Sequence, residues 1–224
     1  MLKSVIFDMD GTVLDTLSDL HTATNVSLTK NGLPKRSLDE VRRFVGNGIR
    51  RLVELAVPEG SDKGTVDAVF ADFNDYYKDH CADRTRAYPG INTLLSSLRQ
   101  AGVKTAVVSN KSDYAVQELV ERYFKGGFDY ALGVKDGVPR KPAPDMVYAA
   151  LSALGAAKEE AVYVGDSDVD LMTAKNSGLP CIAVTWGFRD RAFLRAHGAT
   201  RFADRPADVL RLVELLLGAD PRDS

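Results

Sequence analysis

Basic residues are not in excess in this chain, and long apolar runs are missing. Lys and Arg total 29 against 31 Asp and Glu, which gives a formal net charge of −2. This balance argues against a basic surface that binds nucleic acid or an anionic membrane. No apolar run is long enough to span a bilayer, and the N-terminus lacks the pattern of a secretory signal peptide. We therefore expect a cytoplasmic protein that binds neither membranes nor nucleic acid.

Cysteine and histidine are also scarce, with two and three residues in 224. Cys81 and Cys181 lie far apart and have no metal-ligand spacing, so we expect reduced thiols in a reducing compartment. His21, His80 and His197 show no metal spacing either. Thiols and imidazoles therefore give no indication of a metal site.

Near the N-terminus, a short apolar run is followed at once by acids. Residues 5–7 read as a buried β-strand that ends before Gly11. Asp8 and Asp10 follow, and residues two apart on a strand share a face, so their carboxylates could meet. Carboxylates this close repel each other, and a bound cation would relieve the repulsion. An ordinary strand with a polar turn gives the same local pattern, so partners elsewhere in the chain decide between the two interpretations.

The rest of the chain divides into two regions by its hydrophobic pattern. Residues 16–82 carry apolar residues at helical spacing and contain no strand candidate. From Tyr88 on, strand and helix candidates alternate, which predicts an α/β fold with a doubly wound, Rossmann-like parallel sheet. We expect an α/β core formed by residues 1–15 and 83–224, with an all-helical cap domain inserted at 16–82. The strands expected after the first are 103–108, 130–134, 161–164 and 181–185.

Polar side chains follow the ends of these expected strands. The ends lie along one edge of an open α/β sheet, where ligands bind. There Asp8 and Asp10 would meet Ser109-Asn110-Lys111, Lys141 and the acidic segment 166–170. Acids, a hydroxyl and a Lys at one edge indicate phosphoryl transfer, because a phosphate must be neutralised and held in line with a nucleophile. Mg²⁺ suits such carboxylates, so we expect it as the cofactor.

Single residues of this edge have their own expected roles. Ser109 would offer a hydroxyl and nearby backbone N–H groups to a phosphate. Lys141 would hold phosphoryl oxygens and offset charge on the nucleophile. Asn110 is either a helix N-cap or a phosphate contact, and Lys111 either contacts the substrate or is solvated surface. Asp168 is expected to be a surface acid in the first turn of a helix.

Four segments of the chain, residues 8–12, 109–110, 141–142 and 165–170, resemble the ordered motifs of the haloacid dehalogenase-like hydrolase superfamily. The resemblance implies that Asp8 is a nucleophile that forms an aspartyl-phosphate, with Asp10 acting first as acid and then as base. It implies that Asp8, Asp166 and the Asp10 carbonyl ligate Mg²⁺. Asp170 would support the metal or its waters from outside, and Thr12 would orient the phosphate or the turn. The segments are Asp8-Met9-Asp10-Gly11-Thr12, Ser109-Asn110, Lys141-Pro142 and Gly165-Asp166-Ser167-Asp168-Val169-Asp170.

Substrate choice is expected to depend on the helical region. Gly46-Asn47-Gly48 precedes a helix that carries Arg50, and N–H groups at that helix start would accept an anionic or polar substrate end. An interhelical turn explains the same glycines, and the directions of Arg43, Arg50 and Arg51 stay open. Elsewhere, Trp186 and Phe188 either line the pocket edge or pack. The Gly46 segment and four others together resemble phosphoglycolate phosphatases. The others are Asp15-Thr16, Asp19-Leu20, Tyr88-Pro89-Gly90 and Thr185-Trp186-Gly187-Phe188.

The resemblance favours a magnesium-dependent phosphatase that acts on a small phosphorylated metabolite, with phosphoglycolate as the first candidate. Alternatives are a phosphatase of a sugar phosphate, pyrophosphate or nucleotide, and a β-phosphoglucomutase-like phosphomutase. A phospho-Asp signalling module is a distant alternative, because such a module is one small domain without a helical insertion. A dehalogenase is disfavoured, because Asp10 and the metal-type acids have no purpose in displacing halide. The protein is expected to act as a monomer or homodimer.

Overall fold

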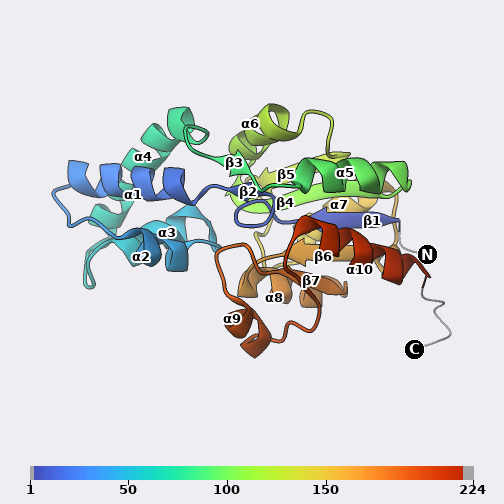
Figure 1. Cartoon of the computed structure of the whole chain (residues 1–224). Coiled ribbons are helices and arrows are strands. Elements are labelled where there is room, and N and C mark those ends of the chain that lie inside the picture. The colour runs from blue at the N-terminus through green and yellow to red at the C-terminus, as the bar shows by residue number, and fades with distance from the viewer. Residues whose placement is uncertain (1–2, 219–224) are drawn as a thin grey trace. The chain divides into compact units, whose positions relative to one another are not determined.

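The chain folds into two units, which are coloured along the sequence in Figure 1. The computed structural model describes residues 3–218. One unit holds the chain up to Val13 and again from Ala87, and the other holds Leu14–Arg86. The division expected at residues 15/16 and 82/83 lies within a few residues of these bounds. Strands β2 (Leu14–Asp15) and β3 (Arg86–Ala87) pair where the chain passes between the units.

The larger unit is built on a sheet of six strands in the order β5-β4-β1-β6-β7-β8, and all neighbours are parallel. The strand order reverses beside β1, so the connections wind in both directions from the centre, as in a doubly wound fold. The predicted fold class is confirmed. The strands are β1 (Ser4–Phe7), β4 (Lys104–Ser112), β5 (Tyr130–Val134), β6 (Ala161–Gly165), β7 (Cys181–Val184) and β8 (Phe202–Ala203).

Two strands differ from the sequence prediction. β4 continues to Ser112, whereas the apolar pattern ends at Val108. The pairing with β5 shifts register between Val108 and Ser112, so the polar end of β4 is an irregular extension that period-two apolar alternation does not mark. β8 is not among the predicted strands, because its two residues are too few to show the alternation of apolar side chains that marks a strand.

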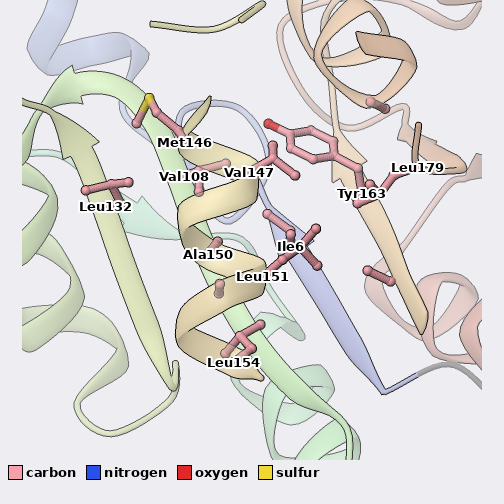
Figure 2. Close-up of a cluster of buried hydrophobic side chains, with 13 residues drawn as sticks. Ile6, Val108, Leu132, Met146, Val147, Ala150, Leu151, Leu154, Tyr163 and Leu179 are labelled. Atoms are coloured by element: carbon pink, nitrogen blue, oxygen red, sulfur yellow. The ribbon is translucent and has the colours of Figure 1, made fainter. Parts of the chain in front are cut away.

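Helices pack on the faces of this sheet, with α7 against α8 and α5 against α10. Figure 2 shows Ile6 of β1, Val108 of β4 and Tyr163 of β6 beside the apolar face of α7. Burying such side chains stabilises the unit by roughly 25 cal/mol for each Å² of apolar surface removed from water. The helices are α5 (Ile91–Gln100), α6 (Asp113–Phe124), α7 (Asp145–Leu154), the 3₁₀ turn η1 (Lys158–Glu160), α8 (Asp168–Ser177), α9 (Arg191–Ala196) and α10 (Pro206–Gly218).

The smaller unit is helical, as the sequence predicts. Its helix α1 packs against α2 and α4, and α3 packs against the same two helices. Among the described residues, none of the chain's helices has both the length and the apolar composition to cross a membrane. The helices of this unit are α1 (Leu17–Lys30), α2 (Leu38–Phe44), α3 (Gly48–Ala56) and α4 (Lys63–His80).

A buried acid ties the two ends of this helical unit together. Asp19 lies in the first turn of α1 and is 3% exposed. Its carboxylate accepts bonds from the backbone N–H of Arg84 at 2.9 and 3.0 Å, and from the N–H and Oγ1 of Thr85 at 2.8 and 2.9 Å. Because buried N–H groups need partners, Asp19 fixes the segment that returns from α4.

Replacing this acid should destabilise the fold. In Asp19→Asn, one carboxylate acceptor oxygen becomes an amide NH2 donor that faces other N–H donors, so we expect the free energy of unfolding to fall by about 1–3 kcal/mol. Urea unfolding measures the change. The control Asp39→Asn alters an exposed acid at the start of α2 and should change stability by less than about 0.5 kcal/mol. Equal stability of the two variants would contradict the role assigned to Asp19.

Candidate active site

The predicted site residues of the larger unit gather at the carboxyl edge of its sheet. Asp8 follows β1, Ser109 lies near the end of β4, and Asp166 follows β6. Adjacent parallel strands therefore present these side chains together. The buried members of the group are Asp8, Thr12, Ser109, Asn110, Lys111, Lys141, Asp166 and Asp170.

Lys141 lies at the centre of the group, with an ammonium that is almost fully buried. Its Nζ donates to Asp8 Oδ1 at 2.6 Å, to Asp170 Oδ1 at 2.9 Å and to the Tyr163 hydroxyl at 3.1 Å. An ammonium has three N–H groups, and these three partners match them. Burial opposes the charged form, but Asp170 and Asp8 raise the pKa of Lys141 well above its usual value. The side chain is therefore a fixed positive charge beside Asp8.

The segment around Lys141 is held by amides from two other elements. Asn110 Nδ2 of β4 donates to the carbonyl of Lys141 at 3.0 Å. Asn176 Nδ2 of α8 donates to the carbonyl of Pro142 at 2.8 Å. The N-cap interpretation of Asn110 is wrong, because β4 continues past this residue and Ser112 precedes α6. Asn110 instead helps to position the Lys141 loop.

Asp170 is bonded on both carboxylate oxygens. Oδ1 accepts from Lys141 at 2.9 Å and from the Tyr163 hydroxyl at 3.0 Å. Oδ2 accepts from the backbone N–H groups of Asp166 and Ser167 at 3.2 and 3.1 Å, and from Ser167 Oγ at 2.6 Å. Ser167 and Asp170 also form the capping box that begins α8. Five bonds hold this carboxylate in a fixed orientation; its expected support of a metal ion stays a prediction.

Asp166 is also oriented on both oxygens. Thr12 Oγ1 donates to Oδ1 at 3.0 Å, and the backbone N–H of Phe188 donates to Oδ2 at 2.7 Å. Burial, with Asp170 nearby, raises the pKa of Asp166 to about 7. Burial and Asp170 likewise raise the pKa of Asp8, and Lys141 acts against them.

Three of these carboxylates could hold a metal ion. One oxygen each from Asp8, Asp166 and Asp170 lie within 4.8 Å of one another. Together with Asp10, the site holds four acids, and Lys141 and Lys111 form ion pairs with three of them. A hard divalent cation with oxygen ligands fits this donor set and would offset the negative charge of these buried acids.

Lys111 belongs to the site, and the expectation that it is solvated surface is wrong. Its side chain is 1% exposed, and Nζ lies 3.2 Å from Asp10 Oδ1. The backbone N–H of Lys111 also donates to Ser109 Oγ at 3.2 Å. The irregular end of β4 turns this side chain inward, which the sequence pattern does not reveal.

Tyr163 is a site residue that sequence reasoning missed. Its ring packs in the core on β6, and its hydroxyl bridges Lys141 and Asp170 (Figure 2 labels the residue). Burial raises the pKa of this phenol well above its usual value, so it stays protonated. One signal was available, because a Tyr inside an apolar buried strand needs a partner for its hydroxyl.

Asp168 and Trp186 lie near the acid cluster, and neither contributes an oxygen to it. Asp168 is partly exposed in the first turn of α8, with Arg189 Nε at 3.9 Å. Trp186 packs near Tyr88, and its Nε1 donates to the carbonyl of Thr12 at 3.0 Å.

The predicted specificity residues lie in the helical unit. Gly46 and Gly48 have φ of +129° and +82°, a region that favours glycine, and they flank Asn47 at the start of α3. The Asn47 side chain makes no cap bond to the helix. Arg50 pairs with Asp67 at 2.6 Å and lies over the ring of Phe70. Arg51 pairs with Glu54 at 3.1 Å, so both arginines bond within their own unit.

This sheet with its edge of acids, lysines and hydroxyls is the architecture of a haloacid dehalogenase-like hydrolase. The model of that family, the haloacid dehalogenase-like hydrolases, matches residues 5–184, and the chain belongs to this family. The resemblance drawn from the four motifs is therefore confirmed.

Named relatives are similar over nearly the whole chain. A phosphoglycolate phosphatase from Rhodobacter capsulatus is 34% identical, and the match covers 91% of this chain and 94% of that one. An N-acetylmuramic acid 6-phosphate phosphatase from Pseudomonas aeruginosa is 32% identical over 96% of each chain. A crystal structure from Lactobacillus delbrueckii subsp. bulgaricus, provisionally named a phosphoglycolate phosphatase, is 41% identical with a TM-score of 0.90. That match covers 94% of this chain and 98% of the other.

The acid cluster should make stability depend on pH when no divalent cation is present. The pKa of Asp166 is about 7 in the folded protein against 3.8 as its ordinary value, so the folded state holds this proton more tightly. The resulting stabilisation is complete below pH 3.8 and is lost as the pH rises through about 7. The raised pKa of Asp8 acts in the same direction. In urea titrations with EDTA, the free energy of unfolding should therefore fall between about pH 5 and about pH 8.

The variant Asp166→Asn is the control, because its amide does not titrate. We expect a shallower fall over the same pH range, and addition of a divalent cation should stabilise the parent protein most at the higher pH. The same slope in both proteins would contradict the pKa assigned to Asp166.

Proposed function

We propose that this protein is a magnesium-dependent phosphatase that hydrolyses a small phosphate monoester through an aspartyl-phosphate on Asp8. The observation that carries the proposal is the Asp8 carboxylate, 2.6 Å from a buried ammonium and clustered with Asp166 and Asp170. This arrangement offers a nucleophile, a positive charge for phosphoryl oxygens and a cation site in one place. Relatives at 32–34% identity that are phosphatases support the same reaction class.

In the first step, an Asp8 oxygen attacks phosphorus and the bond from phosphorus to the ester oxygen breaks. Asp10 gives its proton to the leaving oxygen, and Lys111, 3.2 Å away, holds the Asp10 side chain in place. Lys141 stays beside Asp8 and faces the negative charge of the phosphoryl group. Ser109 adds a hydroxyl at the same edge, Thr12 orients Asp166 through its own hydroxyl, and Asn110 positions the Lys141 loop.

In the second step, Asp10 takes a proton from water, which attacks the phosphorus of the aspartyl-phosphate. The bond from phosphorus to the Asp8 oxygen breaks, inorganic phosphate leaves, and both carboxyl groups return to their initial states. Bound Mg²⁺ would be held by Asp8, Asp166 and the Asp10 carbonyl, with Asp170 behind them, and would supply positive charge toward the phosphoryl oxygens. Phosphate monoesters hydrolyse very slowly without a catalyst, so this electrostatic contribution must be large.

We further propose that the substrate is a phosphorylated carboxylic acid, with phosphoglycolate first. Two kinds of named relatives act on phosphoglycolate and on N-acetylmuramic acid 6-phosphate, and both compounds carry a carboxylate besides the phosphate. In the helical unit, Gly46 and Gly48, which carry no side chains, lie at the start of α3 beside the backbone N–H groups of its first turn. Such N–H groups are suited to a carboxylate, which supports this unit as the one that selects the substrate.

N-acetylmuramic acid 6-phosphate is the second candidate substrate. The relative with that name matches 96% of its own length, as much as the phosphoglycolate phosphatase from Rhodobacter capsulatus at 94%. The two candidates differ greatly in size, so a direct comparison of rates separates them.

The test compares kcat/KM for three esters with Mg²⁺: phosphoglycolate, N-acetylmuramic acid 6-phosphate and ethyl phosphate, which lacks a carboxylate. We expect the preferred acid to exceed ethyl phosphate by at least about tenfold, since a charge-assisted hydrogen bond contributes about 1.5–3 kcal/mol. Equal values for all three would refute carboxylate recognition.

Two variants examine the chemistry in the same assay. Asp8→Asn should abolish phosphate release while the protein stays folded, because the amide is not a competent nucleophile. Asp136→Asn changes an exposed acid of the same unit and should keep full turnover. Appreciable turnover by Asp8→Asn would show that the nucleophile is another residue.

A further inference from the structure

The loop after β7 contacts two segments of the site through Trp186 and Phe188. Trp186 Nε1 donates to the carbonyl of Thr12 at 3.0 Å, in the turn that follows β1. Phe188 N–H donates to Asp166 Oδ2 at 2.7 Å, at the end of β6. Since β7 pairs with β6, the loop leaves the sheet beside Asp166. We call residues 186–188 the clamp loop.

Gly187 lies between these two bonds and is pressed against both segments. A Cβ at this position would lie 2.4 Å from Asp166 Cβ, 2.4 Å from Asp166 Oδ2 and 2.4 Å from the carbonyl oxygen of Gly11. Real Cβ atoms do not approach other atoms this closely, and one of the neighbours is backbone. Close approach therefore requires glycine here. The missing side chain lets the Phe188 N–H reach the carboxylate.

The two bonds on Asp166 come from the segments that follow β1 and β7, the two strands that flank β6. Thr12 Oγ1 holds Oδ1 and the clamp loop holds Oδ2, so the plane of the carboxylate is fixed. The Phe188 donor is a backbone group, which has no side-chain rotamers to lose on binding. Trp186 adds a bond to the backbone of Thr12 itself, so the loop holds both Asp166 and the residue that orients it.

We propose that the clamp loop positions Asp166 for the divalent cation, and that Gly187 is the positioning residue that makes this possible. The inference rests on the proposed cation site, and it adds a loop that the four motifs do not include. Partners that orient metal ligands typically contribute about 10–100-fold in metal affinity.

The test is Gly187→Ala, with calorimetric titration of the metal-free protein by Mn²⁺ alone. The added Cβ should displace Asp166, so we expect Mn²⁺ affinity to fall by at least about tenfold. Circular dichroism and thermal unfolding report on the fold in parallel. An Mn²⁺ affinity equal to that of the parent protein, with or without a lower Tm, would overturn the proposal.

Gly198→Ala is the matched control. Gly198 follows α9 with φ +95° and has nothing within 4 Å of a built Cβ, so alanine strains the backbone away from the site. This variant should lose thermal stability and keep the Mn²⁺ affinity of the parent. If its affinity fell as much as that of Gly187→Ala, general destabilisation would explain both results and the positioning role would be refuted.

Trp186→Phe keeps the test decisive if Gly187→Ala does not fold. Phenylalanine retains an aromatic ring but removes the N–H bonded to Thr12, so Mn²⁺ affinity should fall about threefold. Unchanged affinity in this variant would contradict the proposal. Because Mn²⁺ binding is measured without a substrate, failure of the phosphatase proposal would leave this result interpretable on its own.

Discussion

One buried ammonium between two carboxylates is the interaction on which the active-site edge depends. Lys141 contacts Asp8 at 2.6 Å and Asp170 at 2.9 Å in a place that solvent hardly reaches. Losing one partner of a buried pair typically costs about 3–5 kcal/mol, because the other charge is left without compensation. Because they are buried, Lys141, Asp8 and Asp170 stabilise one another only when all three are present. The same geometry places a positive charge beside the proposed nucleophile.

The fold satisfies this requirement by bringing three partners to Lys141: Asp8 from far along the chain, and Tyr163 and Asp170 seven residues apart. Asp8 follows β1, Lys141 precedes α7, Asp170 lies in the first turn of α8, and Tyr163 reaches up from the core of β6. Tyr163 is informative because it is neutral: it accepts from Lys141 and donates to Asp170 without adding charge. The acids still outnumber the lysines, and the excess is what makes a divalent cation fit the site.

The fold class and most residues of the candidate site could be predicted from the sequence, because apolar periodicity and short motifs are properties of neighbouring residues. Alternation of strand and helix patterns indicated the doubly wound sheet, and the family model and relatives confirm the class that the four motifs indicated. Lys111 and Gly187 could not be predicted in the same way. The direction of Lys111 depends on the register shift at the end of β4, and the need for glycine at 187 depends on a contact with Asp166 that forms only in three dimensions.

The central claim is that Asp8 becomes covalently phosphorylated, and chemical trapping tests it most directly. The protein is mixed with its best substrate and Mg²⁺, quenched in acid during turnover, reduced with borohydride and analysed by peptide mass spectrometry. An aspartyl-phosphate is reduced to homoserine, so the account predicts homoserine at position 8 and unmodified Asp10 and Asp166 in the same sample. Robust turnover with no modification at Asp8, or with the phosphoryl group trapped on another residue, would contradict it.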